Sequence, residues 1–136
     1  MDIIETLLDQ PYWIIDLLPK QVPAGSPGQY FAIEQYYLHK ASIWQHKLNI
    51  ILKLNCYYDV LAVVQETEYV NPFPETMEDF IRHHYLNIIV DGSLIVSDPD
   101  STYLTVYQPN DALLSLLNVL ASGNGMYVWK PDEMVE

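Results

Sequence analysis

The chain has 136 residues, of which 50% are apolar and 18% are charged, and its formal net charge is −12 at pH 7. An apolar content this high argues against an intrinsically disordered chain. The shortage of Lys and Arg argues against nucleic acid and against anionic membrane surfaces as partners. A chain of this length buries enough surface for one core, so we expect residues 1–136 to form a single domain.

The N-terminal part is expected to hold two helices separated by a proline-rich loop. Apolar residues at helical spacing predict a first short helix over 2–10. An apolar segment, Tyr12–Leu18, follows and leads into the loop. The sequence Ser26-Pro27-Gly28-Gln29 then matches a helix start, because Ser caps, Pro suits the first helical position and Gln completes a capping box. We expect this second helix to reach about Ala41 and to extend at most to His46.

From Lys47 the apolar pattern changes its period from about four to two. Apolar and polar residues alternate over 48–54, which predicts a half-buried strand. The more apolar segment Tyr58–Val64 predicts a central strand. After a loop at Asn71–Pro74, the capping pattern of Thr76 and Asp79 predicts a helix that ends near residue 84.

The clearest local signal is Asp91-Gly92, which lies between the apolar segments Leu86–Val90 and Ser93–Ser97. This dipeptide is the preferred connection of a two-residue β-hairpin. A second turn at Asp98–Asp100 then leads into a strand over Thr102–Tyr107.

Asn110 is expected to cap a helix from residue 111 to about Ala121, with Gly123 at its C-terminal end. A last strand is expected over Met126–Lys130. Together the elements predict an α+β fold, in which three to four helices pack on one face of a mostly antiparallel sheet of about five to six strands.

The four histidines are the first candidates for metal or acid–base chemistry. They form two pairs along the chain, His39 with His46 and His83 with His84, and Asp79 precedes His83 by one helical turn. No third ligand stands at a fixed spacing, and no zinc-binding motif is present in the sequence. Positive groups at a helix C-terminus explain the second pair, so we predict neither a metal ion nor a cofactor.

Motifs for nucleophilic catalysis and phosphate binding are also missing from the sequence. Cys56, the only thiol, has no sequence neighbour that would lower its pKa. Gly123-Asn124-Gly125 follows a predicted helix, whereas phosphate-binding loops precede one. A single cysteine forms no intrachain disulfide, and the N-terminal segment lacks the basic start of a secretory signal. We therefore assign no catalytic residue and expect a cytoplasmic protein.

Acidic residues are concentrated in the second half of the chain, where residues 59–111 carry ten Asp and Glu but only one base, Arg82. The chain also has eleven tyrosines, a residue type enriched at protein interfaces. An acidic surface with exposed tyrosines attracts a basic protein and speeds its encounter. The candidate surface consists of Glu66, Glu68, Tyr69, Glu75, Glu78, Asp79, Asp98 and Asp100.

Two hypotheses from different classes follow. The first is a non-catalytic interaction domain, such as an inhibitor or immunity-type protein that binds a basic nuclease or toxin. The alternative is a small hydrolase or metal-dependent enzyme, which requires at least three His or carboxylate groups to converge in one pocket. A homodimer remains open, because apolar segments such as 48–64 offer surface to a second copy. Solubility alone also explains a net negative charge.

Overall fold

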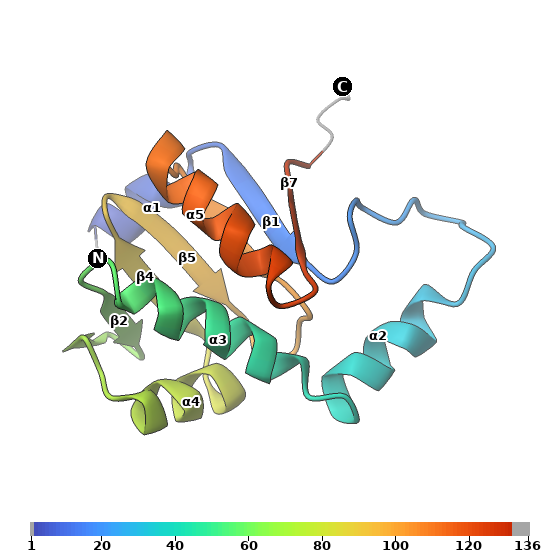
Figure 1. Ribbon diagram of the computed structural model, residues 1–136, viewed down its shortest axis with the longest axis horizontal. Helices are drawn as coiled ribbons and strands as arrows, with labels where there is room; N and C mark the ends of the chain where they lie inside the picture. Colours follow the sequence, from blue (N-terminus) through green and yellow to red (C-terminus); the bar gives the residue numbers. More distant parts are fainter. Residues whose placement is uncertain (1, 132–136) are drawn as a thin grey trace.

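The computed structural model describes residues 2–131 and is organised around one seven-stranded antiparallel sheet (Figure 1). The strands lie side by side in the order β3-β2-β4-β5-β6-β1-β7. Their bounds are β1 Tyr12–Asp16, β2 Leu61–Val64, β3 Thr67–Val70, β4 Leu86–Val90, β5 Ser93–Ser97, β6 Leu104–Tyr107 and β7 Tyr127–Trp129. The N-terminal strand β1 thus pairs with the two last strands of the chain.

Five helices accompany the sheet in the described residues: α1 Asp2–Leu8, α2 Tyr30–His39, α3 Ile43–Asn55, α4 Pro74–His83 and α5 Asp111–Ser122. Helices α3, α4 and α5 cover one face of the sheet, whereas α2 stands off to one side (Figure 1). Helix α1 packs against β5 on the opposite face. Within residues 2–131, no helix is both long and apolar enough to cross a membrane.

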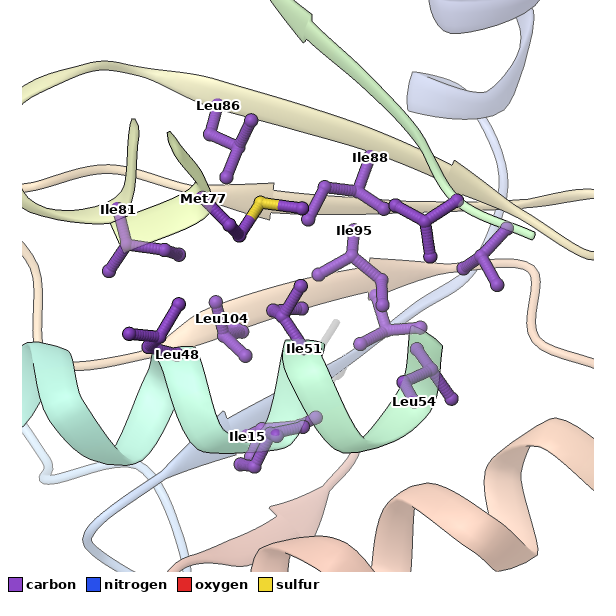
Figure 2. Packing of buried hydrophobic residues seen from close by; sticks show 14 of the residues in the cluster. Ile15, Leu48, Ile51, Leu54, Met77, Ile81, Leu86, Ile88, Ile95 and Leu104 are labelled. Atoms are coloured by element: carbon purple, nitrogen blue, oxygen red, sulfur yellow. The ribbon is translucent and has the colours of Figure 1, made fainter. Parts of the chain in front are cut away.

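The main core lies between the sheet and the three covering helices, as Figure 2 shows. Ile88 on β4 and Ile95 on β5 point toward Ile51 on α3. Because successive side chains of a strand face opposite sides, the neighbours of Ile95 leave this core. Leu94 and Val96 instead form a second, smaller cluster with Leu7 of α1. The sheet therefore has one fully covered face and one partly covered face.

The α+β class and several local predictions are confirmed. Asp91 and Gly92 both have positive φ angles, of 49° and 77°, and join β4 to β5 as a two-residue hairpin. The Asn110 side chain accepts a hydrogen bond of 2.8 Å from the backbone N–H of Leu113 and caps α5. Gly123 is the C-terminal cap of the same helix. Seven strands and five helices exceed the predicted numbers.

The predicted strand over 48–54 is wrong, because these residues belong to helix α3. Leu48, Ile51 and Leu54 are all buried, at the spacing of one helix face. An alternating strand would place Ile51 opposite Leu48 and Leu54, and Leu52 beside them. The apolar residues of this short segment fit both periods, and packing beneath the sheet selects the helix.

The predicted helix start at Ser26 is also wrong. The backbone N–H of Ser26 donates to the Pro23 carbonyl, 3.2 Å away, within the loop, and α2 begins only after Gln29. Ser42 then adopts a left-handed conformation with φ of 54°, which separates α2 from α3. The segment therefore contains two helices with different directions.

The segment predicted as the strand Tyr58–Val64 contributes only its second half to the sheet, as β2. Asn71 holds the first half in a turn: its side-chain oxygen accepts from the Val60 backbone N–H at 2.8 Å and from Asn55 Nδ2 at 2.9 Å. Its Nδ2 donates to Asp59 Oδ1 at 3.0 Å. Asn71 therefore connects the end of α3 to the start of β2.

The starts of α4 and β6 also differ from the sequence prediction, and one strand was not predicted. Helix α4 begins at Pro74 and not at Thr76, because proline is well suited to the first turn. Strand β6 begins at Leu104, two residues later than expected. Strand β3 was not predicted, since Gln65 and Glu66 form its hairpin turn with positive φ angles that usually require Asn or Gly.

Truncation of Ile51 to Ala is expected to lower the free energy of unfolding by about 2–4 kcal/mol, because this side chain is fully buried under the sheet. The matched change Leu52→Ala is expected to cost clearly less, because Leu52 is only partly buried. Urea unfolding of both variants measures the difference. A larger loss in Leu52→Ala would contradict the helical packing of this segment.

Candidate ligand-binding cavity

The part of the second sheet face that α1 leaves uncovered forms the floor of a cavity of about 530 Å³. A volume of this size is typical of small-molecule sites. The floor consists of side chains from β1, β6 and β7: Tyr12, Ile14, Asp16, Thr105, Tyr107 and Trp129. The walls come mainly from the loop after β1, the start of α2 and the segment before β6: Leu18, Lys20, Gln21, Val22, Tyr30 and Tyr103.

Asp16, the last residue of β1, brings a carboxyl group into this cavity and is only 6% exposed. Its Oδ1 accepts hydrogen bonds from the Leu17 backbone N–H at 2.7 Å and from Thr102 Oγ1 at 3.0 Å. Burial raises the pKa of Asp16, the two hydrogen bonds oppose this effect, and the charge of Glu34 adds to it. Since both hydrogen bonds converge on Oδ1, Oδ2 is the oxygen that remains for a ligand.

Three tyrosines of the cavity keep their hydroxyl protons well above neutral pH. Burial and the nearby Glu34 carboxylate raise the pKa of Tyr30 to about 12, and the Tyr30 hydroxyl donates to Glu34 Oε2 at 3.1 Å. Burial also raises the pKa of Tyr103 and of Tyr107. The Tyr107 ring packs 5.3 Å from the ring of Tyr12, measured between centroids. The cavity therefore offers neutral aromatic rings and hydroxyl groups beside one carboxyl.

Trp129 ties the loop after β1 to the sheet. Its Nε1 donates a hydrogen bond of 2.9 Å to the backbone carbonyl of Leu18. This contact joins residues 111 positions apart in the chain and fixes the start of the loop over the cavity floor. Among the described titratable groups, four of the five with a clearly shifted pKa line this cavity. Such clustering is typical of functional sites.

A second cavity, of about 500 Å³, lies beside the N-terminal half of α3 and is lined by Lys47. Lys47 is 1% exposed, and its Nζ donates to the backbone carbonyls of Asp98 and Ser101 at 3.0 and 3.1 Å. Burial lowers the pKa of Lys47 to about 8, although the Asp98 carboxylate opposes the change. The buried ammonium therefore holds the β5–β6 turn against α3.

The residues of the predicted acidic surface lie on three parts of the fold. Glu66, Glu68 and Tyr69 belong to the β2–β3 hairpin, Glu75, Glu78 and Asp79 to α4, and Asp98 and Asp100 to the β5–β6 turn. The Tyr69 ring packs 4.9 Å from the Phe80 ring and so joins the hairpin to α4. None of these eight residues lines the first cavity.

Basic groups stand among these acidic residues. Arg82 lies 3.4 Å from Glu78, and His84 lies 3.5 Å from Asp79, between nitrogen and carboxylate oxygen. Strand pairing brings the β2–β3 turn and the β5–β6 turn to the same end of the sheet, with the start of β4 between them. The structure thus brings the acidic residues of the hairpin and of α4 together. Asp98 and Asp100, in the β5–β6 turn, are separated from the hairpin by the start of β4.

The histidines and the cysteine occupy separate surroundings. His39 and His83 line the second cavity together with Asp100, whereas His46 belongs to α3 and His84 faces Asp79. Within residues 2–131, no three His, Cys, Asp or Glu side chains are placed to hold a metal ion. Cys56 is exposed and forms the C-terminal cap of α3.

Sequence reasoning missed the first cavity, including Asp16 and its tyrosines. The available signal was the alternation of Tyr12, Ile14 and Asp16, which places a tyrosine and a carboxyl on one face of a strand. The partner residues come from β6 and β7, about 90 to 115 positions later, and only the strand pairing reveals them.

No family model, curated protein or solved structure matches the chain.

Asp16→Asn is expected to raise the melting temperature at pH 7 by roughly 2–4 °C. The amide oxygen can accept the same two hydrogen bonds, while the cost of burying a charge disappears. Because the pKa of Asp16 is raised by folding, wild-type stability falls as pH rises from the unfolded value, near 3.8, through the folded one. The advantage of the variant should grow over this interval and then stay constant.

Thermal melts between pH 3.5 and 8 measure this difference. Glu34, Tyr30 and Tyr103 also face the site, and they remain in both proteins, so the comparison isolates Asp16. Glu5→Gln, at an exposed carboxyl outside the cavity, is the control. A lower melting temperature of Asp16→Asn at pH 7 would show that the carboxylate stabilises the fold.

The pKa of Lys47 predicts a second pH dependence. In the folded chain Lys47 loses its proton near pH 8, and in the unfolded chain near 10.5. The unfolded state therefore binds more protons in this interval, and wild-type stability should gain up to about 1.4 kcal/mol per pH unit there. Lys47→Met should lack this gain.

Urea unfolding of both proteins at pH 7, 8, 9 and 10 measures the difference. Tyrosines with raised pKa values oppose the gain above pH 10, but they do so equally in both proteins. Parallel stability curves from pH 7 to 10 would mean that Lys47 keeps its proton throughout.

Proposed function

We propose that this protein is a non-catalytic interaction domain that binds a basic protein partner, as an inhibitor or an immunity-type protein does. The observation that carries the proposal is helix α2, which buries none of its ten residues although most of them are apolar or aromatic. Phe31 is 72% exposed and Tyr36 is 54% exposed. Tyr37 and Leu38 attach the helix to the main core from its C-terminal half.

A helix of this length is marginal in water unless another surface covers its apolar side. Exposed aromatic side chains on one element are also the usual anchors of protein interfaces, because they bury a large area at a small cost in rotamer freedom. The exposed side chains of α2, Tyr30, Phe31, Ile33 and Tyr36, therefore provide the contact area for a partner. Ordering by the partner would stabilise α2 in turn.

The charge of the protein supports a basic partner. The chain carries a net charge of −12, and the carboxylates of the candidate acidic surface are exposed or half-buried. An acidic surface of this kind attracts a cationic protein and raises the association rate. We propose that Glu66, Glu68, Tyr69, Glu75, Glu78, Asp79, Asp98 and Asp100 contribute to this attraction, with no role for nucleic acid or membrane lipids.

The proposed location is the cytoplasm, which the single, free cysteine supports. The enzyme alternative has weaker support: His39, His83 and Asp100 line one cavity, but the described residues provide neither a metal-holding group nor an activated nucleophile there. A second copy of the chain is the other candidate partner for the exposed side chains of α2. Light scattering separates this outcome from a basic partner, because only self-association raises the mass of the purified protein.

Affinity capture from an extract of the source organism, with bound proteins released by rising salt, tests the proposal. One basic protein is expected to elute at intermediate salt. The double variant Phe31→Ser, Tyr36→Ser should bind it at least tenfold more weakly, the loss of about 1.4 kcal/mol. Val119→Ser, at an exposed apolar residue of α5, is the matched control and should bind normally.

Charge reversal at Glu75, Glu78 and Asp79 should lower the association rate constant. The dissociation rate constant should stay unchanged, because exposed charges act mainly on the encounter of the two proteins. Stopped-flow mixing or surface binding at two salt concentrations measures these rate constants. Unchanged affinity in the α2 double variant would overturn the docking role of α2. Unchanged association in the charge-reversed variant would overturn the acidic surface.

A further inference from the structure

The cavity on the second sheet face has a charge imbalance that the proposed function does not use. Asp16 is nearly fully buried, yet both groups that hydrogen-bond to it are neutral: a backbone N–H and the Thr102 hydroxyl. The ion pairs found in the described residues are Arg82 with Glu78 and His84 with Asp79. No Lys or Arg therefore pairs with Asp16, although a buried carboxylate is costly without a cation.

We infer that this cavity binds an organic cation, with an alkylammonium group placed against the Asp16 carboxylate and between the surrounding tyrosine and tryptophan rings. The inference does not rest on the proposed function, because Asp16, Tyr12 and Tyr107 belong to the sheet and not to α2. Tyr30, at the start of α2, is the residue that the two surfaces share.

The aromatic walls favour this ligand chemistry. Tyr12, Tyr30, Tyr103 and Tyr107 line the cavity with Trp129, and the faces of such rings attract cations. A carboxylate among several aromatic rings is a suitable environment for a primary or quaternary ammonium group. Glu34, hydrogen-bonded to the Tyr30 hydroxyl, adds a second negative charge near Asp16.

The alternatives of an anion and of a metal ion fit less well. Lys20 is the one basic side chain of the cavity lining, and it is exposed, so water screens its charge. Asp16 is buried, so water screens its charge less than that of Lys20. Within residues 2–131 no cluster of three His, Cys, Asp or Glu side chains is placed to hold a metal. The cavity volume of about 530 Å³ also exceeds what a bare ion needs and suits a small organic molecule.

Titration of the full-length protein tests the inference. Choline chloride serves as the probe for a free quaternary cation, and Nα-acetyl-lysine N-methylamide serves as the probe for a lysine side chain. The neutral control, 3,3-dimethylbutan-1-ol, has the shape of choline without its charge. Calorimetry gives the affinity, and NMR shifts of the Trp129 indole N–H and of the β1 and β6 amides locate the binding.

At least one cationic probe is expected to bind and shift these signals, and the neutral alcohol should bind at least tenfold more weakly. The probe that binds more tightly tells whether a free quaternary ammonium compound or a lysine side chain is the better ligand. Asp16→Asn should weaken cation binding at least tenfold while the variant stays folded. Lys20→Ala should strengthen binding, because it removes a like charge from the rim.

Tyr107→Leu provides a second variant that keeps the charge of Asp16 and removes one aromatic wall, and it should also weaken the cation. Glu5→Gln, at an exposed carboxyl outside the cavity, should leave the affinity unchanged. Equal binding of the alcohol and of choline would overturn the inference, and so would full affinity in Asp16→Asn. If the protein binds acetate and Lys20→Ala abolishes this binding, the cavity is an anion site and the inference is overturned. The absence of binding by either cation at tens of millimolar would overturn it too.

Discussion

The pairing of β1 between β6 and β7 is the constraint on which the rest of the structure depends. It joins the first strand of the chain to the last two, with Ile15 opposite Leu104 on one side and Val128 on the other. The alternation within β1 then assigns Ile15 to the main core and Asp16 to the open face. Both the core under the helices and the floor of the cavity therefore require this one long-range pairing.

The β5–β6 turn is held from both faces of the sheet by ionisable side chains. On the helix side, Lys47 donates to the carbonyls of Asp98 and Ser101. On the open side, Thr102 donates to the Asp16 carboxyl. The six residues between β5 and β6 thus provide hydrogen bonds to a buried cation and to a buried carboxyl of opposite charge, and they separate the two cavities that these groups line.

Local interactions were readable from the sequence, and long-range ones were not. The Asp91-Gly92 hairpin and the Asn110 cap depend on residues within a few positions of each other, so a short stretch of sequence is enough to predict them. The sequence predicts the wrong element around Ile51, because a short apolar run fits both a strand and a helix. Packing of this segment against the sheet selects the helix. Asp16 was missed because Thr102, which orients its carboxyl, lies 86 positions away.

Strand β3 is the first strand in the sheet order, so within residues 2–131 one side of its backbone faces no neighbouring strand. All four of its residues are exposed. Such an edge is a template for pairing with another chain unless charges or covering elements prevent it. Glu66 in the turn and Glu68 within the strand place carboxylates along this edge, where two copies would bring like charges together. These two carboxylates therefore disfavour pairing of two copies of the chain along the edge of β3.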